Sequence, residues 1–132
     1  MTGSQTPPGS EPRVLPPLSA SREAGPFVFV SGQVGVDPAS GAVSGPDVTT
    51  QTEQVLRNLA RVLEGAGLDF SDVVKTTVFL TEAGDFARMN AVYSAHFSVP
   101  FPTRSTVAVS ALARPELVVE VEAIALRRDR GT

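Results

Sequence analysis

The chain has 132 residues, of which 42% are hydrophobic and 19% charged, so one folded domain with a buried core is expected rather than a disordered chain. The net charge of −3, without a cluster of Lys and Arg, argues against a nucleic-acid partner, because a phosphate groove needs several neighbouring cations. The chain has no Cys and a single His, His96. These counts exclude thiol nucleophiles, disulfides, cysteine-ligated metals and a multi-histidine metal centre.

The N-terminal segment is rich in Pro, Gly and Ser, which predicts a flexible tail over residues 1–13 and a single domain over residues 14–130. It lacks the charged start and apolar core of a signal peptide. No apolar run approaches the ~20 residues of a membrane-spanning helix. We therefore expect a cytoplasmic protein without a membrane partner.

The first half of the predicted domain contains a strand, a return strand and a helix. An apolar run between glycines over residues 25–33 predicts the strand. Asp-Pro and Ser-Gly pairs within residues 36–43 predict a hairpin-like return, which counts as the second strand. Asp47 is placed to cap a helix over about residues 48–66, and Gly67 to end it in a left-handed conformation.

The second half contains a strand, a helix and two further strands. Residues 72–80 are rich in β-branched side chains and predict a strand. A helix then begins at Thr81 or Asp85. Four large side chains recur along it at helical spacing and are interpreted as core: Phe86, Met89, Tyr93 and Phe97. Proline residues end this helix, and the last strands are predicted over residues 104–109 and 117–128.

This order of elements predicts the fold class. Two amphipathic helices suffice to cover one face of a mixed sheet of four to six strands, which gives a two-layer α+β domain. Three of the strands carry apolar residues on both faces. Because no further helix is available for the second face, a partner subunit is expected to cover it.

Two charged positions stand out against these apolar strands. Arg104 precedes the apolar run of its strand, and alternation in the last strand places Glu120 and Glu122 on one face with large aliphatic side chains. A buried carboxylate needs a partner or a proton. Either this face is partly wet, or one Glu neutralises Arg104 in a structural ion pair, or Arg104 binds a carboxylate substrate while a Glu handles a proton or a water. The spacing leaves these alternatives open.

Four segments resemble, in order, the signature blocks of the Rid family, also called YjgF-like or L-PSP proteins. They read "FVSGQVGVDPASGAV", "QTEQVLRNLARVLEGAGLDFSDVVKTTVFLTEAGDFARMNAVYSAHF", "FPTRSTVAV" and "VEVEAIA". The resemblance runs from about Pro16 to Arg128. It implies a chorismate-mutase-like fold with two helices on one face of the sheet, assembled as a homotrimer around a central barrel, with sites in the clefts between subunits.

The resemblance also implies a function. Members of this family act as hydrolytic deaminases of 2-imino and enamine acids, giving 2-oxo acids and ammonia without a metal or organic cofactor. By likeness to the family pattern, Arg104 clamps the substrate carboxylate and Glu120 positions the water. The remaining substrate-binding positions implied in the same way are Ser31, Gly32, Asn90 and Thr106, the last through its backbone.

The chain departs from the family pattern at two positions. An active-site Tyr of the deaminases aligns with Leu18, and Thr106 stands where they often have Cys. The loss of a phenol makes the expected pocket more apolar. It favours a second hypothesis, a non-catalytic trimeric binding or regulatory protein for small carboxylates such as 2-oxo acids. The ribonuclease activity attributed to some relatives fits an acidic chain poorly.

Overall fold

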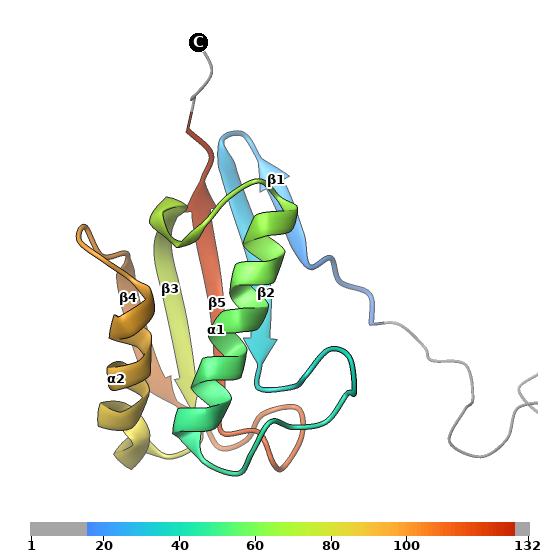
Figure 1. Ribbon diagram of the computed structural model, residues 1–132, viewed down its shortest axis with the longest axis vertical. Helices are drawn as coiled ribbons and strands as arrows, with labels where there is room; N and C mark the ends of the chain where they lie inside the picture. Colours follow the sequence, from blue (N-terminus) through green and yellow to red (C-terminus); the bar gives the residue numbers. More distant parts are fainter. Residues whose placement is uncertain (1–15, 129–132) are drawn as a thin grey trace, which may run out of the picture.

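The computed structural model describes residues 16–128, and the predicted tail over residues 1–13 lies outside them. These residues form one sheet with strand order β1-β2-β5-β3-β4, in which β3 and β4 are parallel and the other pairs antiparallel (Figure 1). The strands are β1 Ser21–Ala24, β2 Phe27–Val34, β3 Val73–Leu80, β4 Thr103–Ala108 and β5 Val119–Leu126. The helices are α1 Val48–Gly65 and α2 Phe86–His96, with short 3-10 turns η2 Phe70–Asp72 and η3 Ala83–Asp85.

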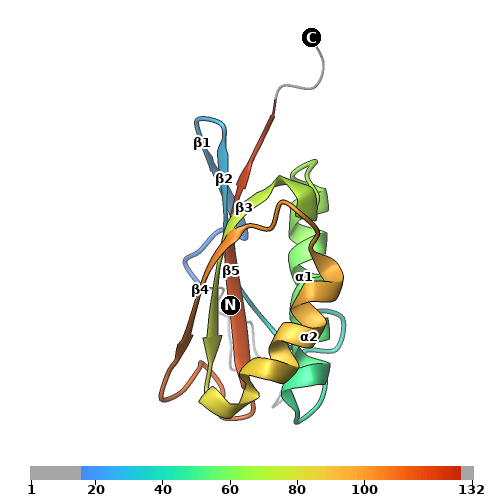
Figure 2. The ribbon, with the colours of Figure 1, turned by 90° about the vertical axis from the view of Figure 1, so that its left-hand side faces the viewer.

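Both helices lie on one side of the sheet, and the other side carries no helix of residues 16–128 (Figure 2). We call these sides the helix face and the open face. The core lies at the helix face, where Leu59 of α1 and Val121 of β5 are fully buried. The predicted two-layer α+β class is therefore confirmed, and the trimeric barrel remains a prediction. None of the described helices is long and apolar enough to cross a bilayer.

The ends of α1 follow from its sequence. Asp47 accepts a hydrogen bond from the backbone N–H of Thr50 at 2.7 Å, which satisfies one of the unpaired donors of the first turn. Gly67 has φ +79°, a left-handed conformation that a side chain would strain. The predicted helix over residues 48–66 thus lies within one residue of the observed one.

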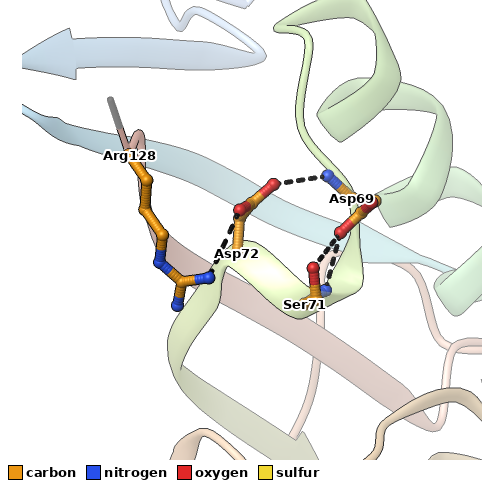
Figure 3. Close-up of polar contacts among 4 residues, drawn as sticks. All are labelled: Asp69, Ser71, Asp72 and Arg128. Carbon is orange, nitrogen blue, oxygen red and sulfur yellow. Dashed lines mark hydrogen bonds and ion pairs between the residues drawn. The ribbon is translucent and has the colours of Figure 1, made fainter. Parts of the chain in front are cut away.

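The turn between α1 and β3 is held by carboxylates (Figure 3). Asp69 accepts a hydrogen bond from the backbone N–H of Ser71, and its own N–H donates to the buried Asp72 carboxylate at 3.0 Å. Arg128 lies 4.0 Å from the same carboxylate. These contacts attach the start of β3 to the chain that follows β5.

The strand count at the N-terminal end differs from the sequence prediction. The hairpin-like return predicted over residues 36–43 is present as an antiparallel bridge between Val36 and Val43, but it is too short to count as a strand of the sheet. The missing strand is β1, which precedes β2 and reaches it through a turn at Gly25, with φ +60°. It went unnoticed because SREA is short, polar and mostly exposed, as suits an edge strand.

Candidate active site

Arg104 lies on the helix face, at the edge of the sheet. In the parallel ladder it pairs with Thr76, whose buried side chain contacts α2. The guanidinium Cζ lies 4.7 Å from the ring centroid of Tyr93 and 5.6 Å from that of Phe86. A cation above the face of an aromatic ring at such a distance is attracted by the ring quadrupole. Arg104 therefore rests on two rings of α2.

A cleft of about 620 Å³ opens beside this cation. Its walls come from α2 and from the segment that enters β4, and they include Asn90, Phe101 and Pro102. Within residues 16–128, Arg104 forms no ion pair with an acidic side chain. A positive charge that no described carboxylate neutralises thus faces a partly apolar cleft, which is an arrangement suited to an anionic ligand.

Glu120 lies on the open face. It pairs with Phe79 of β3 and Val34 of β2, and it is partly buried. Its carboxylate lies directly over Gly32, where an added Cβ would collide with Glu120 Oε2. Gly32 therefore makes room for this carboxylate, which explains why a glycine stands inside a strand.

Two effects act on the acidity of Glu120. Burial raises the pKa of its carboxyl, and the neighbouring negative charge of Glu122 raises it further. No salt bridge to Glu120 forms among the described residues. A carboxylate with a raised pKa and room around it is suited to accepting a proton from water.

The other implied positions are divided between the two faces. Thr106 pairs with Val78 on the helix face, two residues after Arg104 along β4. Ser31 lines a second cavity of about 780 Å³ on the open face, together with Leu18. Its hydroxyl donates to the backbone carbonyl of Ser19 at 2.6 Å, which attaches the N-terminal segment to β2.

The structure therefore brings the candidate residues together in two groups, not one. Arg104, Asn90 and Thr106 belong to the helix face and its edge. The open face holds the second group, which is Ser31, Gly32 and Glu120. The ion pair between Arg104 and a Glu is not formed within the chain, because the sheet separates the two side chains.

Sequence reasoning missed the part of the site that Tyr93 and Phe86 form. Their helical spacing suggested core, and this is correct for Tyr93, which is 5% exposed. Phe86 is 44% exposed because it begins α2 at the edge of the sheet. The sequence signal that could have revealed this contact is an Arg on the strand that directly follows a helix with aromatic side chains along one face. The described residues contain no group of three or more His, Cys, Asp or Glu that could hold a metal.

Comparison with known proteins gives a consistent family. The model of the family described as "Endoribonuclease L-PSP" matches residues 9–127. Protein DfrA of Myxococcus xanthus is 47% identical over 117 residues, which cover 87% of this chain and 88% of that protein. The 2-iminobutanoate/2-iminopropanoate deaminase of Salmonella typhimurium is 43% identical over 120 residues, which cover 89% and 92%.

The solved structures agree with these sequence matches. The crystal structure of the YjgF gene product of Escherichia coli superposes with a TM-score of 0.80 at 40% identity, covering 89% of this chain and 93% of that one. Membership of one family thus explains both the two-layer fold and the order of the sequence blocks. The chain belongs to the Rid family, also known as the YjgF-like or L-PSP family.

Proposed function

We propose that this chain is a hydrolytic deaminase that converts 2-imino and enamine acids into 2-oxo acids and ammonia. The observation that carries the proposal is the cation of Arg104, which faces an open cleft and has no acidic partner among residues 16–128. Every substrate of this class carries a carboxylate beside the reacting carbon. The family relationship supports the same chemistry, because a relative with 43% identity is named for it.

In the proposed reaction, Arg104 binds the substrate carboxylate through its planar fork of N–H donors. Asn90 lies in the same cleft and supplies a further polar contact, and the backbone at Thr106 completes the binding edge. Holding the carboxylate fixes the position of the neighbouring C=N carbon. Positioning is a large part of the work required, because such imines also hydrolyse unaided.

Glu120 then acts on water. Its carboxylate accepts a proton as the water oxygen bonds to the C=N carbon, and it returns this proton to the nitrogen to give a carbinolamine. Transfer of the hydroxyl proton to the nitrogen then breaks the C–N bond and forms the C=O bond, which releases ammonia. The raised pKa of Glu120 suits this role, since a stronger base accepts the proton more readily. Gly32 leaves the space that the carboxylate occupies, and Ser31 lies in the adjacent cavity.

Assembly is required because one chain holds Arg104 and Glu120 on opposite faces of its sheet. We propose a homotrimer in which the Arg104 edge of one copy meets the Glu120 face of the next. The open face has apolar side chains for such contact, including Phe27 and Phe29, which are 41% and 45% exposed. Exposed aromatic residues on a sheet face are typical of an interface.

The test is ammonia release from imines that an amino-acid oxidase generates in situ. The wild-type protein should exceed spontaneous hydrolysis, and Glu120→Gln should be slower by roughly 10²-fold, as expected for loss of a general base. Glu122→Gln is the comparison variant, because Glu122 is an exposed carboxylate of the same face and strand that acts on Glu120 only through its charge, so its turnover should stay far above that of Glu120→Gln. Wild-type turnover in Glu120→Gln would show that another group activates the water.

A binding or regulatory protein for 2-oxo acids is the second candidate. It is favoured by Leu18, an apolar side chain that lines the open-face cavity where the deaminases have a phenol. The two candidates differ in turnover, so binding of 2-oxo acids without ammonia release above background would select the second. We do not propose ribonuclease activity, because the net charge of −3 opposes RNA binding.

A further inference from the structure

The guanidinium of Arg104 is held by aromatic rings and not by a carboxylate. Its Cζ lies 4.7 Å from the Tyr93 ring and 5.6 Å from the Phe86 ring, and no acidic side chain of residues 16–128 pairs with it. This is unusual for a partly buried Arg, since such a cation is commonly neutralised by Asp or Glu. Among the described residues the cation is therefore met by the two ring faces and by the Tyr93 hydroxyl, which accepts a hydrogen bond from the guanidinium.

The nearer ring is itself fixed in place from two sides. The Tyr93 hydroxyl shares a hydrogen bond of 2.7 Å with the Thr76 hydroxyl, which is fully buried in β3. Phe97 stacks on the Tyr93 ring with a centroid separation of 4.4 Å and an interplanar angle of 25°. The ring thus forms a rigid floor beneath the guanidinium and connects β3, α2 and β4.

We propose that Tyr93 is the positioning residue for Arg104, and that its ring holds the guanidinium from below while the N–H donors that the Tyr93 hydroxyl does not accept stay available for a ligand carboxylate. The proposal rests on the proposed function, in which Arg104 is the carboxylate clamp. A carboxylate partner in place of the ring would occupy the same N–H donors and compete with the substrate. The face of an aromatic ring attracts the cation without accepting hydrogen bonds from its N–H donors.

Substitutions separate the ring from its hydroxyl. Tyr93→Leu removes the ring, and we expect the dissociation constant for 2-oxobutanoate and the KM for imines to rise about 5- to 10-fold with kcat nearly unchanged. Tyr93→Phe keeps the ring and should stay within about 2-fold of wild type, although it loses the hydroxyl's hydrogen bonds to Thr76 and to Arg104. This rescue by Phe would not occur if the hydroxyl were the functional group.

Two further variants control for stability. Phe97→Leu removes a ring that contacts Tyr93 but not Arg104, so it should lower the unfolding temperature without weakening 2-oxobutanoate binding. Phe86→Leu removes the more distant ring at an exposed position, so it should fold normally and weaken binding about 2- to 3-fold. Phe86→Leu remains informative if Tyr93→Leu does not fold.

The wild-type protein offers a direct readout as well. Tyr93 is the only tyrosine, and the chain has no Trp, so tyrosine fluorescence reports on this ring alone. Titration with 2-oxobutanoate should change the emission and saturate at the dissociation constant measured by calorimetry. The change should vanish in Arg104→Ala.

The outcomes distinguish this inference from the function on which it rests. Weakened binding in Arg104→Ala with wild-type binding in Tyr93→Leu and Phe86→Leu would overturn the positioning role alone. Equal weakening in Tyr93→Phe and Tyr93→Leu would also overturn it, because the hydroxyl would then be responsible. Wild-type binding in Arg104→Ala would instead overturn the carboxylate clamp of the proposed function.

Discussion

The two faces of the sheet differ in what completes them. On the helix face, Val78, Val119 and Val121 are each fully buried beneath α1 and α2. On the open face, Phe27 and Phe29 remain 41% and 45% exposed. The chain thus covers one face with its own helices and leaves apolar side chains exposed on the other. Under the proposed assembly, a second copy covers this open face and completes the site.

The charged residues of the two faces also lie in opposite electrostatic surroundings. Arg104 rests on aromatic rings that favour its charge. Glu120 lies in a desolvated place beside Glu122, so its pKa is raised and its charge is disfavoured. One face therefore offers a permanent cation and the other a proton acceptor. A 2-imino acid needs both, because its carboxylate must be held while water attacks the adjacent carbon.

The largest expected effect comes from removing the cation. Arg104→Ala should weaken 2-oxo acid binding by ~2–4 kcal/mol, because a charge-assisted bidentate contact is lost from a partly buried site. Arg104→Lys should recover little of this, since a point charge cannot reproduce the fork. Isothermal titration calorimetry with 2-oxobutanoate measures both.

A matched control is available on the adjacent helix. Arg88→Ala removes an exposed Arg of α2 that does not line the cleft, so it should leave binding unchanged. If Arg88→Ala weakens binding as much as Arg104→Ala, net charge and not the clamp attracts the anion. Unfolding of Arg104→Ala together with Glu120→Gln would instead point to a structural ion pair between copies.

The second prediction tests whether the two faces meet between copies. Arg104→Ala and Glu120→Gln should each be nearly inactive, but trimers refolded from an equal mixture should regain about a quarter of the wild-type activity, because a quarter of random neighbouring pairs combine both intact residues. Ammonia release from the mixture, compared with each variant alone, measures the gain. A mixture no more active than its components would place both residues within one copy's own site or exclude this assembly.

The fold was largely predictable because its signals are local. Alternation correctly separated the two faces of β5, and the structure shows that Val119 and Val121 are on the core side and Glu120 on the other. The apolar stripe and the Asp47 cap correctly placed α1. The strand β1 was not predictable in this way, because its four residues, three of them polar, form a strand only through pairing with β2.

The site was less predictable because it depends on register between strands. Alternation within β4 places Arg104 and Thr106 on the same face of the sheet, but it does not show whether this is the helix face or the open face. Only the pairing of Arg104 with Thr76 shows that this face is the one that α2 covers. For the same reason the spacing left open an ion pair between Arg104 and one Glu of β5, which the sheet prevents within one chain.

The third prediction concerns the pH dependence of the rate, and its expected effect is smaller than those above. Because Glu120 has a raised pKa, kcat/KM for imine hydrolysis should rise with pH through a value above the ordinary range of a Glu. Glu122→Gln removes the second cause of the shift, so this rise should move to lower pH and make the variant faster than wild type on the acid limb. Rate measurements across pH with both proteins check this.

The same carboxyl has the opposite effect on folding stability. In the folded protein Glu120 keeps its proton at pH values where the unfolded chain has lost it, so its contribution is present at low pH and is lost as pH rises through the raised pKa. Glu120→Gln should abolish this dependence in urea titrations. Parallel pH profiles of stability in wild type and Glu120→Gln would show that the fold does not raise the pKa of the Glu120 carboxyl.

The smallest expected effect concerns Leu18, which is 64% exposed and lines the open-face cavity together with Phe29 and Ile124. An apolar wall without a phenol should accept imino acids with larger side chains. Leu18→Tyr should therefore shift the ratio of kcat/KM about 2-fold toward the smallest substrates, with little change in unfolding temperature because the site is exposed.

Leu18→Phe separates the two properties of tyrosine, since it adds the ring without the hydroxyl. A shift in both variants assigns the preference to volume, and a shift in Leu18→Tyr alone assigns it to a hydrogen bond. Identical substrate profiles in all three proteins would remove Leu18 from the pocket wall.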